Sequence, residues 1–194
     1  MSKRVLVVVD MQEDFTRGAL RNEEGIKIIP KVAEKIQKAR AEGTAVIFTR
    51  DTHTDAYMQT EEGKNLPVPH CIRDTDGWQI VSELASEEKE RVLNTADGNV
   101  VYGNETGDRV IDKETFGSVV LGETLRDMNQ TEEIREVEFV GLCTDICVIS
   151  NALLAKAFLP NAHIKVDSGC CAGVTPESHE TALQAMRACH VEVV

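Results

Sequence analysis

The sequence predicts an α/β protein, a three-layer α/β/α sandwich built around a mainly parallel sheet. Short apolar, β-branched runs alternate along the chain with segments of helical periodicity, as in folds made of strand–helix–strand units. The first run, Val5–Val9, is apolar throughout, which is typical of a parallel strand buried on both faces. At 194 residues, with no linker or low-complexity tract, the chain is expected to form one domain spanning 1–194.

The first half of the chain is expected to hold two strands and two helices. Arg4–Val9 forms the first strand, and Thr44–Thr49 forms the second. Between them, Pro30–Glu42 carries apolar residues at helical spacing and is closed by Gly43. Gln79–Leu84 has the pattern of a short helix. The polar stretch 86–108 is the least regular and has room for a hairpin.

The second half continues the alternation. Thr175 precedes a proline and is the expected cap of the last helix. The expected strands are Arg109–Asp112, Val137–Leu142, Ala162–Val166 and Val191–Val194, and the expected helices are Ser118–Met128, Asp145–Phe158 and Pro176–Cys189. Right-handed crossovers then place helices on both faces of the sheet, and the ligand site of such a sheet lies beyond the carboxyl ends of its strands.

Composition limits the functions open to this chain. With 33 acidic and 21 basic residues, the net charge is −12, which opposes binding to nucleic acids or anionic membranes. The apolar run near the N-terminus is too short for a signal peptide, and no stretch is long enough to span a membrane, so a cytoplasmic protein is expected. Its six cysteines are then expected to be reduced, including the Cys170–Cys171 pair in a predicted loop.

Reactive side chains recur where the expected strands end. Asp10, Asp51 with His53, Lys113, and Cys147 each follow a different strand, so they should converge on one rim of the sheet. Cys147 is expected in the first turn of a helix capped by Thr144, where the helix dipole stabilises a thiolate.

The simplest alternative is that Cys147 is a small buried apolar residue. Asp10 at a matching strand end could accept the thiol proton, and Lys113 at another could stabilise the resulting charge. This combination favours a nucleophilic cysteine.

The same rim carries candidate metal ligands. Asp51, His53 and His70 offer the mixture of carboxylate and imidazole that binds Zn, Mn or Fe, with zinc preferred. The segment before His70 is stiffened by prolines, which suits a fixed ligand. Glu62 would complete the set, although Glu61 is adjacent, and the alternative is that both histidines are ordinary loop residues.

Six segments together resemble the isochorismatase-like cysteine hydrolases, and most closely their nicotinamidase-like branch. The resemblance covers nearly the whole chain and rests on the order and spacing of these segments: Val8–Phe15, Thr49–His53, Pro67–His70, Ile111–Phe116, Gly141–Val148 and Asp167–Ala172.

The resemblance implies catalytic roles for several of these residues. It assigns a triad to Asp10, Lys113 and Cys147, with a cis peptide between Leu142 and Cys143 that directs backbone N–H groups at the substrate oxygen.

For the branch, the resemblance also implies a metal that binds a pyridine nitrogen. Phe15 and Phe116 would then lie beside the substrate ring. A homo-oligomer is also expected from the resemblance.

The resulting hypothesis is an amide hydrolase that forms a thioester and converts nicotinamide and water to nicotinate and ammonia. One alternative is a metal-independent amidase of the same superfamily acting on a small carbamoyl or ureido compound. A second is a non-catalytic protein that uses exposed thiols for interaction or redox sensing. An isochorismatase, which cleaves a vinyl ether, needs no nucleophilic cysteine and is disfavoured by Cys147.

Overall fold

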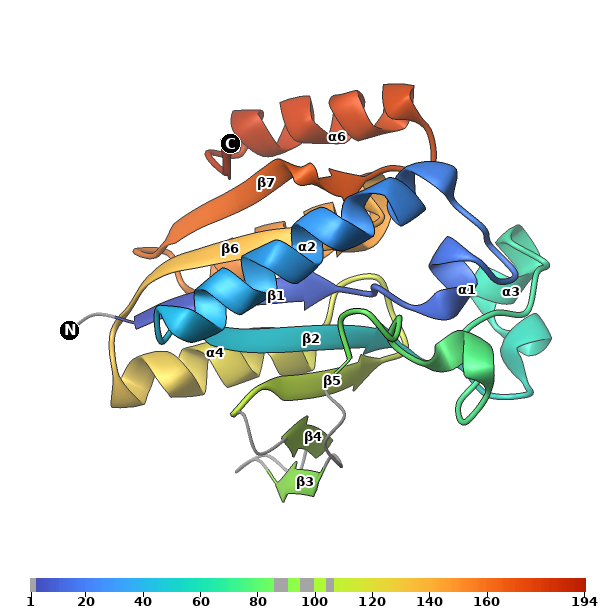
Figure 1. Ribbon diagram of the computed structural model, residues 1–194, viewed down its shortest axis with the longest axis horizontal. Helices are drawn as coiled ribbons and strands as arrows, with labels where there is room; N and C mark the ends of the chain where they lie inside the picture. Colours follow the sequence, from blue (N-terminus) through green and yellow to red (C-terminus); the bar gives the residue numbers. More distant parts are fainter. Residues whose placement is uncertain (1–2, 86–90, 95–99, 104–106) are drawn as a thin grey trace.

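The structure is a computed structural model that describes residues 3–85, 91–94, 100–103 and 107–194. It contains an eight-stranded sheet of order β3-β4-β5-β2-β1-β6-β7-β8 with helices on both faces (Figure 1). The predicted α/β/α sandwich is therefore confirmed. The strands are β1 (Lys3–Val9), β2 (Ala45–Asp51), β3 (Arg91–Asn94), β4 (Val100–Gly103), β5 (Arg109–Lys113), β6 (Ile134–Leu142), β7 (His163–Ala172) and β8 (Glu192–Val193).

The helices alternate with these strands as the periodicity indicates. They are α1 (Glu13–Thr16), α2 (Glu23–Ala41), α3 (Glu61–Asn65), α4 (Val119–Thr131), α5 (Ile149–Phe158) and α6 (Pro176–Ala188), with short helical turns η1 (Tyr57–Gln59), η2 (Asp76–Trp78) and η3 (Thr144–Val148). Thr175 caps α6 with a capping box, as expected.

The sheet is mainly parallel, with one antiparallel edge. Strands β5, β2, β1, β6, β7 and β8 run parallel, and β3 and β4 form an antiparallel hairpin that pairs with β5. This hairpin lies in the stretch 86–108, where one was anticipated.

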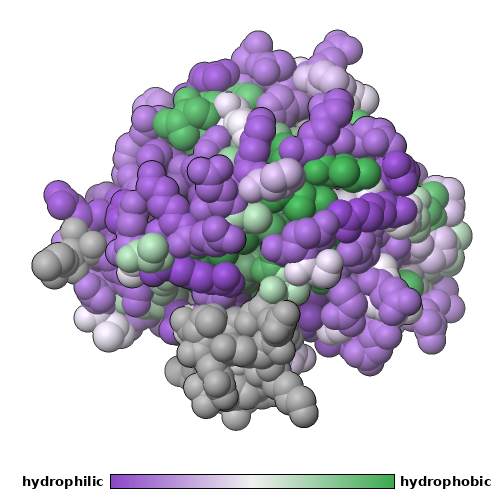
Figure 2. Space-filling view, viewed as in Figure 1, coloured by the Kyte–Doolittle hydropathy of each residue, from purple (hydrophilic) through white to green (hydrophobic). Residues whose placement is uncertain are grey.

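Two apolar cores cover the two faces of the sheet. Val5, Val7 and Val9 of β1 face a core that includes residues of α4, α5 and α6, whereas Leu6 and Val8 face α2. Alternate residues of one strand thus supply both cores, because side chains of a strand alternate between its faces. The outer surface on the α2 side is mostly hydrophilic (Figure 2). No helix in the described ranges is both long and apolar enough to cross a membrane.

Two predicted helices differ from the structure. Helix α2 begins at Glu23 rather than Pro30, because Asn22 accepts a hydrogen bond from the Gly25 N–H and caps it. Pro30 is tolerated inside the helix, where burial of Ile28 and Ile29 against the sheet offsets a cost of about 3 kcal/mol.

The predicted helix Gln79–Leu84 is absent from the structure. Val81 instead donates its N–H to the Met11 carbonyl, and Ile80 forms an isolated bridge with Gln12. The backbone groups that a helix would use internally are thus paired with the segment that follows β1.

The end of the chain contains a third difference. Cys170 and Cys171 lie within β7 rather than in a loop, and all six cysteines are free thiols.

Candidate active site

Four parallel strands end at the same rim of the sheet and deliver the predicted side chains to it. Asp10 follows β1, and Asp51 and Lys113 are the last residues of β2 and β5, where they are direct partners in the strand register. Strand β6 ends at Leu142, and a cis peptide bond joins it to Cys143 at the position that the resemblance implies. The turn that follows carries Cys147.

Asp10, Lys113 and Cys147 form a compact buried group. Lys113 Nζ lies 2.7 Å from Asp10 Oδ2 and 3.6 Å from Cys147 Sγ. The other carboxylate oxygen of Asp10 accepts a hydrogen bond of 2.7 Å from Thr49 Oγ1. Asp10 is fully buried, and Lys113 and Cys147 are 4% and 6% exposed. The lysine therefore contacts both the potential base and the potential nucleophile.

Burial controls the protonation of this group. It raises the pKa of Cys147 well above the usual value, against the opposing effect of Lys113, so the resting cysteine is a thiol. Burial also raises the pKa of Asp10, with Lys113 again acting in the opposite direction, which makes the carboxylate a stronger base. For Lys113 burial lowers the pKa, but Asp10, Cys147 and Asp51 outweigh it, so the pKa is raised and the lysine stays charged.

The turn that carries Cys147 differs from the predicted helix start. Thr144–Val148 forms a π-helical turn, and α5 begins only at Ile149. The predicted Thr144 cap is wrong, because Cys143 occupies the cap position and Thr144 Oγ1 contacts His179 Nδ1 at 2.8 Å instead. Single-turn π-helices are frequent at functional sites.

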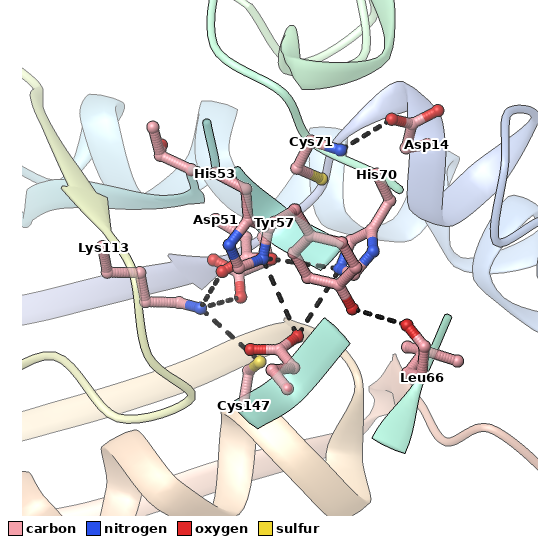
Figure 3. A network of polar contacts seen from close by, with 12 residues as sticks. Asp14, Asp51, His53, Tyr57, Leu66, His70, Cys71, Lys113 and Cys147 are labelled. Carbon is pink, nitrogen blue, oxygen red and sulfur yellow. Dashed lines mark hydrogen bonds and ion pairs between the residues drawn. The ribbon is translucent and has the colours of Figure 1, made fainter. Parts of the chain in front are cut away.

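A second cluster of polar side chains lies beside this group. Asp51, His53, Glu62 and His70 each offer one ligand atom, and these atoms lie within 4.8 Å of one another. Asp51 Oδ2 is 3.0 Å from His53 Nε2 and 3.5 Å from His70 Nε2, and Glu62 Oε1 is 3.7 Å from each imidazole. Figure 3 shows the two rings and Asp51 pointing toward one another, with Lys113 alongside.

Local structure selects Glu62 over Glu61. Thr60 caps α3 by accepting the Gly63 N–H, and this short helix directs Glu62 into the cluster while Glu61 pairs with Lys64 at 3.1 Å on the surface. Of the two glutamates that the sequence offered, Glu62 is the one that lies with the other donors.

The cluster fits a divalent metal ion. Two carboxylates and two imidazoles form a donor set suited to zinc, manganese or iron. The Nδ1 of His70 lies 2.8 Å from the Val68 carbonyl, which fixes the ring and leaves Nε2 facing Asp51. Such a hydrogen bond behind the ring is the usual support of a histidine ligand.

The four donors change one another's protonation. Although burial favours the neutral acid, Lys113 and the two histidines hold the pKa of Asp51 far below its usual range. Burial and the charge on Asp51 raise the pKa of Glu62. Burial lowers the pKa of His70, but Asp51 and the Val68 carbonyl outweigh it and raise that pKa. A cation bound here would therefore compete with protons for Glu62 and His70.

Cys147 and the four donors of the cluster line one cavity of about 1300 Å³. Phe15 and Phe116 both line it, as the resemblance implies. The Phe15 ring is 5.4 Å from that of His70, whereas Phe116 is 46% exposed at the entrance.

Tyr57 is a site residue that the sequence did not reveal. Its ring is 4.7 Å from His53 and 5.0 Å from His70, and its hydroxyl donates to the Leu66 carbonyl at 2.9 Å. It is 1% exposed and packs against both imidazoles, whose ring centroids lie 5.0 Å from each other. The sequence offers little signal for this, because Tyr57 lies in an irregular segment without periodicity.

The arrangement of a parallel sheet, a buried Asp–Lys–Cys group and an adjoining donor cluster defines a hydrolase-like α/β protein. The chain matches the isochorismatase domain over residues 4–106 and 101–194, and it belongs to the isochorismatase family. The predicted family is therefore confirmed.

Individual relatives extend this match over the whole chain. A nicotinamidase/pyrazinamidase of Mycobacterium tuberculosis is 27% identical over 195 residues, which covers 98% of each chain. The structure of the pyrazinamidase of Pyrococcus horikoshii in complex with zinc has a TM-score of 0.77 and 29% identity, and the match covers 99% of this chain and 98% of that one. The N-carbamoylsarcosine amidase of Thermoplasma acidophilum shares the fold, with a TM-score of 0.73 at 24% identity over 98% of this chain and 95% of that one.

Proposed function

We propose that this protein is a hydrolase acting on a linear amide C–N bond, and that it converts nicotinamide and water to nicotinate and ammonia. The observation that carries the proposal is the position of Lys113. Its Nζ lies 3.6 Å from the Cys147 sulfur and 3.1 Å from Asp51 Oδ1, so the nucleophile and the donor cluster are neighbours in one cavity. A substrate with an amide at one end and a metal-binding ring nitrogen at the other fits this pairing.

The first chemical step is transfer of the Cys147 proton to Asp10. The negative charge moves from oxygen to sulfur, and Lys113 contacts both atoms, so the charge of the buried group stays balanced. The thiolate then attacks the amide carbon, and a C–S bond forms. We assign stabilisation of the resulting oxyanion to the backbone N–H groups of Cys143 and Cys147.

The second half of the reaction returns the site to its resting state. Asp10 gives its proton to the amide nitrogen, the C–N bond breaks, and ammonia leaves a thioester on Cys147. Asp10 then takes a proton from water, whose oxygen attacks the thioester carbon. The C–S bond breaks, the thiolate recovers its proton from Asp10, and the carboxylic acid is released.

We assign the divalent metal to Asp51, His53, Glu62 and His70. When bound, the ion would hold the pyridine nitrogen as a Lewis acid and so orient the ring. Phe15 beside His70 and Phe116 at the entrance would exclude water from the ring faces.

A metal-independent amidase acting on a carbamoyl or ureido compound is the second candidate. The shared fold of the N-carbamoylsarcosine amidase makes it worth testing. The clustering of four donors within 4.8 Å of one another favours the metal-dependent reading, because a ureido substrate gives these residues no role. A non-catalytic thiol protein is disfavoured because Cys147 is buried beside a base and a lysine.

Ammonia release decides between these candidates. The zinc-loaded protein should hydrolyse nicotinamide, and removal of the metal with a chelator should reduce the rate, with recovery when zinc is added back. Benzamide, which has the same amide but no ring nitrogen, is the matched control and should be a poor substrate. Turnover of N-carbamoyl compounds but not of nicotinamide would establish the second candidate instead.

A further inference from the structure

At the rim of the sheet, the backbone of Asp51 has no neighbouring strand on the side that faces β1. Strand β1 pairs with β2 only as far as Val9 and Thr49, and the chain then turns away at Asp10, whose φ is 46°. Strand β2 continues to Asp51. The backbone N–H and carbonyl of Asp51 that face β1 are therefore left without a strand to pair with.

The side chain of Gln12 fills this gap. Its Oε1 accepts the Asp51 N–H at 2.7 Å, and its Nε2 donates to the Asp51 carbonyl at 2.9 Å. The same Nε2 donates to the Trp78 carbonyl at 2.8 Å. Gln12 is fully buried, so water cannot take over its hydrogen bonds to these backbone groups. The side-chain amide of Gln12 thus makes the two hydrogen bonds that a neighbouring strand would make, and it fixes the backbone of Asp51.

Asp14 holds the other ligand-bearing segment. Its Oδ2 accepts the backbone N–H of Cys71 at 2.7 Å, as Figure 3 shows, and its Oδ1 accepts the Ala19 N–H at 3.0 Å. Cβ atoms at Gly18 and Gly77 would come within 2.3 Å and 2.2 Å of this carboxylate. The carboxylate is therefore enclosed on two sides and has little freedom to move.

Cys71 links the backbones of both histidines to Asp14. It directly follows His70, and its φ of 47° is uncommon for a residue with a side chain. Its carbonyl accepts the His53 N–H at 2.9 Å, and Arg73 donates its N–H to the His53 carbonyl at the same distance. The backbones of His53 and His70 are thereby joined through the residue that Asp14 holds.

The geometry points to Gln12 and Asp14 as positioning residues that set the affinity of the donor cluster for its metal. Neither is a donor in the cluster. Gln12 holds Asp51 and Asp14 holds the histidine-bearing segment, so a single turn after β1 fixes the cluster from two sides. This inference rests on the proposed metal site, but not on nicotinamide as the substrate.

The two side chains are chemically specific. Gln12 must donate and accept at once, so Gln12→Glu places acceptors against the carbonyls of Asp51 and Trp78. Asp14 must accept twice, and Asn in its place can satisfy either Cys71 or Ala19 but not both. Each substitution keeps the size of the side chain and changes only which hydrogen bonds the side chain can donate or accept.

Cobalt(II) binding to the metal-free protein tests the inference. The dissociation constant, measured by competition with a chromophoric chelator, should rise by about 10- to 100-fold in Gln12→Glu and Asp14→Asn. The visible absorption of bound cobalt should also change, since it reports the arrangement of the donors. Glu13→Gln is the matched control, because this carboxylate pairs with Arg17 at 3.3 Å and should leave both quantities unchanged.

Urea unfolding of the metal-free variants separates positioning from loss of fold. Gln12→Met, which has a similar length and no charge, replaces Gln12→Glu if the latter does not fold. Folded variants that bind cobalt with wild-type affinity and spectrum would overturn the inference. Wild-type protein that binds no cobalt would overturn both the inference and the metal site. Tight cobalt binding without nicotinamide turnover would remove only the proposed substrate, and the positioning roles would still be decided by the variants.

Discussion

The two halves of the site are built in different ways. The Asp10–Lys113–Cys147 group, the proposed triad, rests on the sheet: Asp10 and Lys113 stand at ends of strands β1 and β5, and Cys147 follows β6 by a short turn. Of the four residues in the donor cluster, only Asp51 ends a strand. The remaining donors lie in the segment 53–70, which contains only the short elements η1 and α3.

This difference implies different sources of precision. Strand register sets the triad, because β5 pairs with β2 and β2 with β1 inside a packed core. The donor cluster depends on individual polar contacts, such as His70 to Val68 and Cys71 to Asp14. Lys113 and Asp51 touch across the two halves at 3.1 Å, but substitutions away from this pair should leave the properties of the other half nearly intact. The predictions below test this separation.

The largest effect is expected in the triad half. Cys147→Ala should reduce turnover by at least about 10⁴-fold, because it removes the thiol assigned to form the thioester, while the zinc content stays at the wild-type level. Cys143→Ala is the matched control. This substitution keeps the backbone N–H assigned to the oxyanion and leaves the Cys147 sulfur beside Lys113, so most of the activity should remain. Residual turnover by Cys147→Ala similar to that of Cys143→Ala would show that Cys147 is not the nucleophile.

Asp10→Asn should lower kcat by about 10²- to 10⁴-fold, the usual contribution of a general acid–base group. Without the carboxylate, the thiol loses its assigned base, so alkylation of Cys147 by iodoacetamide should also slow. Thr49→Val removes only the hydrogen bond to Asp10 Oδ1 and should give a smaller effect in the same direction. Normal alkylation and turnover in Asp10→Asn would remove the assigned base.

In the donor half, His70→Ala should weaken zinc binding by more than the roughly 100-fold seen when only an outer partner is lost. The rate of Cys147 alkylation should stay close to the wild-type value, because the contacts of Lys113 with Asp10 and Cys147 do not involve His70. Zinc content and the rate of Cys147 alkylation, measured on the same samples of wild type and His70→Ala, test this prediction. His163→Ala, with a 53% exposed side chain, is the control and should change neither. A loss of alkylation in His70→Ala would mean that the halves are coupled.

The sequence predicted the sheet and its rim because both follow from periodicity. Val5–Val9 is buried on both faces, and a run of this kind leaves little choice of structure or of where the strand ends. Asp10, Asp51 and Lys113 could therefore be placed together before any contact was known. Convergence at the carboxyl edge is a property of parallel sheets and needs no side-chain detail.

The errors lie where long-range contacts override local signals. Thr144 has the residue type of a helix cap but bonds to His179, 35 positions along the chain. The segment Gln79–Leu84 has a helical pattern but pairs with residues 11 and 12. Glu62 could not be separated from Glu61 because α3 is short and has no periodicity to reveal its face. Such features depend on partners that local patterns do not contain.

The smallest effect on the site is expected from the core beneath it. Leu125 of α4 is fully buried, and Leu125→Ala should lower the free energy of unfolding by about 2–5 kcal/mol through lost burial and the cavity left behind. Val119→Ala, on the same helix but 56% exposed, should change it by less than about 0.5 kcal/mol. Urea unfolding measures both. Below the transition, folded Leu125→Ala should keep its zinc affinity and alkylation rate, because both halves are held by contacts at the rim rather than by this side chain. A drop in either property at full folding would show that the core positions the site more directly than the strand ends do.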